Sequence, residues 1–227
     1  MGWSDWIRTV EIEPSLYAAD FSRLGLQIEA LLQTGARIFH FDVGDGHFVE
    51  PVTIGPIVLE SIAGQIHAME GRIDCHLMVD NPLRHFPQIA HAGGDSVTFH
   101  FEAVEDLPAT VAAGRGHGLE VGVAFNPESE PEAVAAAAAT AGVDVVLCMS
   151  IHPGYSGQEF MPEALGRVER LRTLLPAEVH VQVDGGVTLE NVRSIYDAGA
   201  TLIVAGSAIF AREDLPRTYR RLVQALA

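Results

Sequence analysis

Residues 37–48 read R-I-F-H-F-D-V-G-D-G-H-F, an apolar strand pattern that carries ionisable groups. Successive side chains of a β-strand point to opposite faces, so His40 and Asp42 share one face. Burying a histidine and a carboxylate together is unfavourable unless the two pair or a cation lies between them. The stretch therefore predicts a strand that enters the core and ends in a polar site.

Short apolar or β-branched segments of this kind recur along the chain, separated by segments of helical length. The predicted strands are residues 10–16, 37–43, 72–79, 96–102, 120–125, 143–151, 178–184 and 201–207. The predicted helices are residues 20–34, 56–69, 81–92, 105–117, 130–141, 162–175, 188–199 and 212–226. Gly, Pro, Asn or Asp marks most of the joints. This alternation predicts a parallel sheet.

Eight strand–helix units in 227 residues favour an α/β fold in which one (β/α)8 TIM barrel closes on itself. A doubly wound open sheet is the competing architecture, but no G-x-G-x-x-G follows the first strand. No linker or low-complexity tract divides the sequence. We therefore expect residues 1–227 to form a single (β/α)8 catalytic domain.

Composition excludes several classes of partner. The net charge of −16 argues against nucleic acid, which requires a basic surface. The absence of an apolar run of about 18 residues argues against a membrane span, and the N-terminus lacks the layout of a secretory signal. Cys75 and Cys148 lie in apolar segments and are expected to be buried free thiols, which suits a reducing cytoplasm. We expect a cytoplasmic protein.

All fourteen basic residues are arginines. Without lysine the chain can form no Schiff base and has no P-loop lysine for phosphate. A phosphate group would have to be bound by backbone amides, by arginine or by a metal ion.

Four metal-competent side chains lie at predicted strand ends. His40 and Asp42 end the second strand, His76 lies at the matching height of the third, and Asp184 ends the seventh. In a (β/α)8 barrel these positions face one mouth. Two imidazoles and two carboxylates form a plausible shell for a divalent metal, with Zn2+ favoured and Fe2+, Mn2+ or Co2+ as alternatives.

Other ionisable residues are expected to have structural roles and not to bind a metal ion. His100 and His180 are expected to be hydrogen-bonded core residues, because a single strand histidine is more often buried and paired than ligating. Asp45 and His47 are expected to form a turn, since Asp-Gly is a turn signal.

Three Gly-rich segments follow consecutive predicted strands: H-P-G-Y-S-G-Q at 152–158, D-G-G-V at 184–187 and A-G-S-A-I-F at 205–210. Small residues let backbone N–H groups approach an anion closely. The loops after strands seven and eight, with a short helix N-terminus, are the usual phosphate site of these barrels. Amide dipoles would hold a phosphate without lysine.

The motifs together resemble the ribulose-phosphate 3-epimerase family. The matching segments, in the family's order, are P-S-L (14–16), H-F-D-V-G-D-G-H-F-V (40–49), D-C-H-L-M-V (74–79), P-G-Y-S-G-Q (153–158), V-D-G-G-V (183–187) and A-G-S-A-I-F (205–210). The resemblance implies a metal-dependent isomerase that interconverts D-ribulose 5-phosphate and D-xylulose 5-phosphate, a step of the pentose phosphate pathway. It also implies a homo-oligomer.

The resemblance implies roles for individual residues. His40, Asp42, His76 and Asp184 would bind one divalent metal per chain. Asp42 and Asp184 would be the acid/base pair, one on each face of an enediolate that a metal stabilises. The residues expected to bind substrate are Ser15, His76, Met78, Met149, Gly154, Tyr155, Ser156, Gly157, Gly185, Gly186, Gly206 and Ser207.

Departures from the family pattern concern the sugar pocket. Gly44 replaces a usual Met, Glu50-Pro51 replaces Pro-Asn, Ser156 replaces a common Gly, and His152 is also unusual. Gly44 is expected to leave extra room, so a 3-epimerase of another ketose phosphate, such as D-allulose 6-phosphate, is the alternative.

Two other classes of protein fit the sequence less well. A barrel lyase or decarboxylase commonly relies on a catalytic lysine, which this chain lacks. A non-catalytic sugar-phosphate-binding barrel would have no reason to keep both Asp42 and Asp184.

Overall fold

The computed structural model describes residues 2–226, which form a barrel of eight parallel strands. The strands are β1 (Glu11–Pro14), β2 (Ile38–Gly44), β3 (Arg72–Met78), β4 (Ser96–His100), β5 (Glu120–Phe125), β6 (Val145–Met149), β7 (His180–Asp184) and β8 (Leu202–Ala205). Strands β2 to β8 pair in sequence order, and β1 pairs with β8. A single parallel bridge between Ser15 and His40 joins β1 to β2 and closes the ring.

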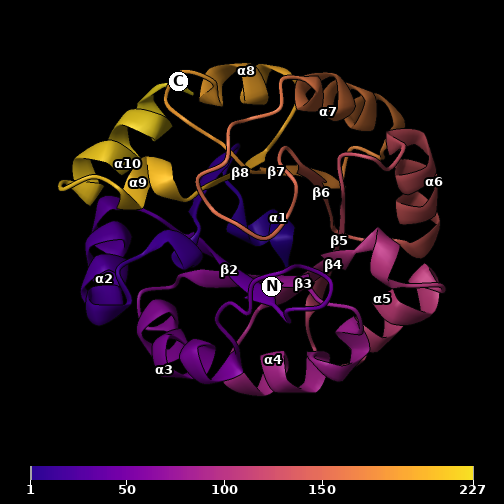
Figure 1. Cartoon of the computed structure of the whole chain (residues 1–227), viewed down its shortest axis with the longest axis horizontal. Helices are drawn as coiled ribbons and strands as arrows, with labels where there is room; N and C mark the ends of the chain where they lie inside the picture. The colour runs from indigo at the N-terminus through magenta and orange to yellow at the C-terminus, as the bar shows by residue number, and fades with distance from the viewer. Residues whose placement is uncertain (1, 227) are drawn as a thin grey trace.

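Helices surround the strands as an outer ring (Figure 1). The α-helices are α1 (Trp3–Trp6), α2 (Leu24–Thr34), α3 (Pro56–His67), α4 (Phe86–Ala92), α5 (Leu107–Gly116), α6 (Pro131–Ala141), α7 (Glu163–Leu174), α8 (Val192–Asp197), α9 (Ser207–Phe210) and α10 (Leu215–Gln224). The 3-10 turns are η1 (Leu16–Ala18), η2 (Phe21–Arg23), η3 (Pro82–Arg84) and η4 (Phe101–Ala103).

The predicted (β/α)8 TIM barrel is therefore confirmed, and every predicted strand and helix overlaps an observed one. The sequence did not reveal α1 or the 3-10 turns η1 and η4. None of the helices formed by residues 2–226 combines the length and apolar character needed to cross a bilayer.

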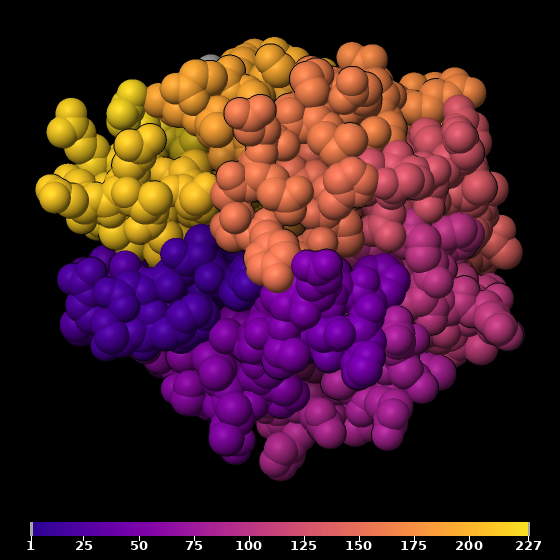
Figure 2. Space-filling model, viewed as in Figure 1, coloured from indigo at the N-terminus to yellow at the C-terminus, as the bar shows by residue number. Residues whose placement is uncertain are grey.

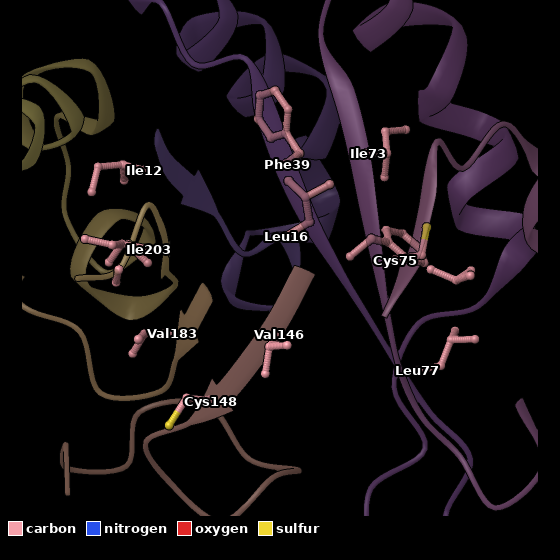
Figure 3. Packing of buried hydrophobic residues seen from close by; sticks show 14 of the residues in the cluster. Ile12, Leu16, Phe39, Ile73, Cys75, Leu77, Val146, Cys148, Val183 and Ile203 are labelled. Carbon is pink, nitrogen blue, oxygen red and sulfur yellow. The ribbon is translucent and has the colours of Figure 1, made fainter. Parts of the chain in front are cut away.

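The main core lies between the barrel and its helices. Strand alternation directs Phe39, Phe41 and Val43 outward into this layer, where all three are buried. Figure 3 shows the same arrangement for Phe39, Ile73, Cys75 and other strand residues. Cys75 and Cys148 are buried and free, as predicted. Side chains on the opposite face of each strand point into the barrel interior.

A small apolar cluster lies at the amino-terminal end of the barrel. Helix α1 lies near the barrel axis (Figure 1), where Trp3 and Trp6 pack with Ile38, Val145 and Leu202 at the starts of β2, β6 and β8. This plug seals the amino-terminal end. His40, Asp42, His76 and Asp184 lie beyond this plug, toward the carboxyl ends of the strands.

Two loops meet over the mouth at the carboxyl ends of the strands. Figure 2 shows the segment around residues 152–158, in orange, touching the segment around residues 45–53, in purple, near the centre of this face. A Cβ atom on Gly154 would lie 3.3 Å from Pro51 Cδ. The two loops are thus in direct contact above the barrel.

Candidate active site

Strand β2 directs His40 and Asp42 into the barrel, and its register places Asp42 opposite His76 on β3. Both histidine rings approach one carboxylate oxygen: Asp42 Oδ1 lies 3.3 Å from His40 Nε2 and 3.2 Å from His76 Nδ1. Asp184, at the end of β7, places Oδ2 4.0 Å from each of the same two nitrogens. The four side chains predicted from strand ends therefore converge.

This convergence suits a cation. His40, Asp42, His76 and Asp184 each offer one ligand atom, and these atoms lie within 4.8 Å of one another. All but Asp184 are buried, and Asp184 is partly exposed toward the mouth. Two nitrogens and two carboxylate oxygens at such spacing match the donor set of a four-coordinate divalent metal with access from one side.

The orientation of His40 supports the same fit. Its Nδ1 lies 3.1 Å from Asp74 Oδ2, and the Asp74 carboxylate also accepts hydrogen bonds from Ser96, Thr98 and Gln182. Asp74 therefore holds a proton on His40 Nδ1 and turns Nε2 toward Asp42. Within residues 2–226 that buried Nε2 has no hydrogen-bond partner. A buried nitrogen without a hydrogen bond that faces a carboxylate is well placed to bind a metal ion.

The electrostatics also call for positive charge at this point. Burial opposes protonation of His40, but Asp42, Asp74 and Glu13 outweigh it and raise the pKa of the imidazole well above its usual value. In the metal-free chain a proton on His40 thus balances the surrounding carboxylates. A bound metal ion would take over that role.

Asp42 and Asp184 have opposite protonation tendencies. Burial disfavours the charged form of Asp42, but His40 and His76 outweigh it and hold the pKa of this carboxyl far below its usual range. Burial and the neighbouring Asp42 raise the pKa of Asp184 to about 7. At neutral pH one carboxyl is therefore ionised while the other can carry a proton, as expected of a coupled acid and base.

Hydrogen bonds fix the position of Asp42. Ser15, at the closing seam of the barrel, donates its hydroxyl to Asp42 Oδ2 at 2.7 Å. Thr53 donates its hydroxyl to the backbone carbonyl of Asp42 at 2.8 Å and accepts from the Gly44 N–H at 2.6 Å. Hydrogen bonds thus hold Asp42 both at its carboxylate and at its backbone carbonyl.

A cavity opens above Asp42 and Asp184. Of the residues expected to bind substrate, all except His76 line it together with these two carboxylates: Ser15, Met78, Met149, Gly154, Tyr155, Ser156, Gly157, Gly185, Gly186, Gly206 and Ser207. His76 and His40 are fully buried beside the carboxylates. Four apolar or aromatic wall residues were not predicted: Tyr17, Ile151, Val187 and Val204. Tyr17 follows the P-S-L motif directly, which is the one signal that could have revealed it.

The Gly-rich loops leave room for an anion where side chains would fill it. A Cβ on Gly206 would lie 3.3 Å from Ala18 Cβ and 3.5 Å from Ser156 Oγ, inside the cavity wall. Gly186 has φ of +60°, and a Cβ there would meet the Phe160 backbone nitrogen at 2.3 Å. A side chain at Gly206 would thus reach the cavity wall, whereas glycine at 186 is required by the positive φ and by the close approach of the Phe160 backbone.

The expectation that Gly44 leaves extra room was wrong. A Cβ on Gly44 would lie 2.9 Å from the Pro51 carbonyl oxygen and 3.0 Å from side-chain atoms of Val49 and Thr53. The loop after β2 folds back through an antiparallel bridge between Asp45 and Val52 and fills this space. The backbone of Pro51 and the side chains of Val49 and Thr53 therefore leave no room for a side chain at position 44.

The turn interpretation of Asp45 is confirmed, because its Oδ1 accepts the N–H groups of His47 and Phe48 at 2.8 Å. His180 lies 3.1 Å from Thr201 Oγ1, apart from the metal-competent cluster. His100 is buried and hydrogen-bonded, as expected. Its partner is His76, a contact that was not foreseen.

Comparison with known proteins agrees with the geometry. The model of the Ribulose-phosphate 3 epimerase family matches residues 11–210. This chain belongs to the ribulose-phosphate 3-epimerase family. It is 40% identical over 200 residues to the ribulose-phosphate 3-epimerase of Schizosaccharomyces pombe, covering 88% of this chain and 86% of that protein. It is 37% identical over 219 residues to the Escherichia coli K12 ribulose-phosphate 3-epimerase, covering 95% and 96%.

Solved structures outside the epimerase family share the barrel. The 3-hexulose-6-phosphate synthase of Salmonella typhimurium superimposes with a TM-score of 0.72 at 16% identity, covering 95% of this chain and 98% of that chain. The orotidine 5'-phosphate decarboxylase of Pyrococcus horikoshii OT3 gives a TM-score of 0.68 at 14% identity, with coverage of 95% and 98%. At such identities the likeness shows the fold alone.

Proposed function

We propose that this protein is a metal-dependent ketose-phosphate 3-epimerase that interconverts D-ribulose 5-phosphate and D-xylulose 5-phosphate. The observation that carries the proposal is the pairing of an ionised Asp42 with a protonatable Asp184 around a cation-binding cluster, at the floor of a cavity. Membership in the epimerase family supports the same reaction.

The two carboxyl groups divide the chemistry. Inverting the third carbon of the sugar requires a base on one face and an acid on the other. In one direction Asp42 accepts the carbon-bound proton while Asp184 donates its own to the opposite face, and the roles reverse in the other direction. Ser15 and the two histidines hold Asp42 in position and in its ionised form.

A divalent cation held by His40, Asp42, His76 and Asp184 would supply positive charge beside the oxygens of the enediolate. We propose Zn2+, because two imidazoles and two carboxylates form a four-coordinate set that this ion accepts. The orphaned His40 Nε2 supports the site independently of the metal's identity.

The phosphate group of the substrate is proposed to bind where the three Gly-rich loops meet. The cavity lining contributed by residues 2–226 includes no arginine, and the chain has no lysine. Backbone N–H groups from 154–157, 185–186 and 206–207, together with the hydroxyl groups of Ser156 and Ser207, are thus donors available to an anion in a protein of net charge −16.

A pentulose phosphate is preferred to a ketohexose phosphate as substrate. The alternative relied on spare volume at Gly44, and the Val49, Pro51 and Thr53 contacts remove that volume. We also propose a cytoplasmic homo-oligomer. The free buried thiols of Cys75 and Cys148 support a reducing compartment, and the strongly exposed Val52 and Ile57 provide apolar surface for association.

Direct assay of the purified chain tests the proposal. D-ribulose 5-phosphate should be converted to D-xylulose 5-phosphate in the presence of Zn2+, with much slower turnover of D-allulose 6-phosphate. Asp42→Asn, which is nearly isosteric, should lose turnover by about 10²–10⁴-fold. A wild-type chain that binds the sugar phosphate but leaves its third carbon unchanged would instead be a binding protein.

A further inference from the structure

The polar residue His100 was interpreted from sequence as a core histidine, but its ring directly contacts a candidate metal ligand. His100 Nε2 lies 2.9 Å from His76 Nε2, and both rings are fully buried. One of these two nitrogens must carry a proton and the other a lone pair for the contact to be a hydrogen bond. The direction of this bond decides which nitrogen of His76 is free for a cation.

The other side of His100 faces an anion. His100 Nδ1 lies 3.4 Å from Glu102 Oε2, two residues further along the chain. Glu102 is held from the loop between β5 and α6, where its Oε1 accepts the Asn126 N–H at 2.8 Å and the Ser129 hydroxyl. Burial disfavours a charged Glu102, but these contacts and His100 outweigh it and lower the pKa of this carboxyl.

The proton positions follow from these contacts. An ionised Glu102 is an acceptor only, and its negative charge 3.4 Å from His100 Nδ1 favours the tautomer with the proton on Nδ1 and a lone pair at Nε2, even though the contact is too bent for an ordinary hydrogen bond. The ring is fully buried, which disfavours the doubly protonated cation, so His100 carries a single proton. His76 must then donate from Nε2, which leaves the lone pair of Nδ1 directed at Asp42 and Asp184.

We propose that Glu102 and His100 are positioning residues that hold His76 in the tautomer whose Nδ1 binds the divalent cation. They act on β3 in the way that Asp74 acts on His40 of β2, through one additional imidazole. Phe48 packs its ring 4.7 Å from that of His100 and limits rotation of the relay. The inference rests on the proposed metal-dependent function and extends it to residues outside the ligand set.

Replacement of the relay should weaken metal binding without removing a ligand. His100→Leu removes the acceptor for His76 Nε2–H, so the competing tautomer, with a proton on Nδ1 facing Asp42, gains population. Glu102→Gln can donate an amide N–H to His100 Nδ1 and reverse the direction of the relay. For each variant we expect the Zn2+ dissociation constant of the full chain to rise about 10–100-fold.

The matched controls separate positioning from packing. His100→Gln keeps an acceptor and a donor in nearly the same places and should recover most of the Zn2+ affinity. His180→Leu makes the same change at a partly buried strand histidine outside the cluster and should leave affinity unchanged. Thermal unfolding with excess chelator should show that all four variants fold in the metal-free form.

Chelator competition on the purified chain measures these affinities, and 15N NMR of the Zn2+-loaded protein reports the His100 tautomer. Unchanged Zn2+ affinity in both His100→Leu and Glu102→Gln, or a His100 proton on Nε2, would overturn the relay while the epimerase proposal stands. Tight Zn2+ binding that depends on Glu102 in a chain without epimerase activity would support the relay and reject the proposed function.

Discussion

His40 and Asp42 lie two residues apart on one strand, and the 3.3 Å between His40 Nε2 and Asp42 Oδ1 is spanned by no hydrogen bond of ordinary geometry in the part of the chain described. The two atoms face each other because Asp74 takes the opposite nitrogen of the same ring. A carboxylate oxygen and an imidazole nitrogen in this relation share a cation, either a proton or a metal ion.

Metal occupancy should depend on the two histidines. The purified chain is expected to bind about one Zn2+, and His76→Ala should reduce occupancy strongly because it removes one of two nitrogen ligands. Elemental analysis after dialysis measures the effect, with His180→Ala as the control at a histidine outside the cluster. A His40→Ala/His76→Ala double variant that still binds one ion per chain would contradict the site.

Isotope exchange at the third carbon of the sugar should distinguish the acid/base roles of the two carboxyl groups. In deuterated water the wild-type enzyme should place solvent deuterium at this carbon in the product. Asp184→Asn should abolish epimerisation yet allow the surviving Asp42 to exchange the proton on its own face, so deuterium enters one epimer only. NMR of the recovered sugar phosphates distinguishes the faces. Near-normal epimerisation in both Asp42→Asn and Asp184→Asn would assign the bases to other residues.

Adding a single methyl group at Gly206 should weaken binding of the substrate's phosphate group. Gly206 has a negative φ, and its added Cβ would lie 3.3 Å or more from its neighbours, so Gly206→Ala should fold normally. The methyl group would intrude into the proposed anion cradle and should raise the KM for sugar phosphate by about tenfold, roughly 1.4 kcal/mol, with a smaller effect on kcat.

Gly166→Ala serves as the matched control, since its Cβ would meet no atom within 4 Å. Steady-state kinetics at two ionic strengths completes the test, because binding by short-range amides should weaken only modestly with salt. A strong dependence on salt would point to binding by distant arginines instead.

Stability of the metal-free chain should fall as pH rises through neutrality because of Glu13. Burial, reinforced by Asp74, raises the pKa of this interior carboxyl to about 7 despite the opposing contacts of His40 and Gln182. A carboxyl with a raised folded-state pKa stabilises the fold while protonated and loses that contribution as pH rises through the folded pKa. Glu13→Gln removes the effect.

From pH 5 to pH 8 the unfolding free energy of Glu13→Gln should increase relative to wild type by an amount on the order of 3 kcal/mol. Denaturant unfolding in excess chelator measures this difference at each pH. Glu60→Gln on the exposed surface of α3 is the control and should follow the wild type throughout. A constant difference between Glu13→Gln and wild type across this range would show that Glu13 is ionised in the fold.

Several properties of the site were predictable from sequence because they follow from local periodicity. Alternation along β2 places His40 and Asp42 on one face, and the strand-end rule for parallel barrels brings His76 and Asp184 to the same mouth. The Gly-rich segments after β6, β7 and β8 likewise had to meet, since these strands are neighbours in the barrel.

What the sequence by itself determined is therefore the barrel, the four converging metal-competent side chains and the identity of the loops over them. Tertiary structure alone decided the filling of the space at Gly44 by residues 49–53, the seam between Ser15 and His40, and the hydrogen bonds of Asp74 and His100 to the two histidines. These depend on interatomic distances between segments far apart in the chain, and a tautomer or a filled volume changes with shifts of less than an ångström that no residue pattern encodes.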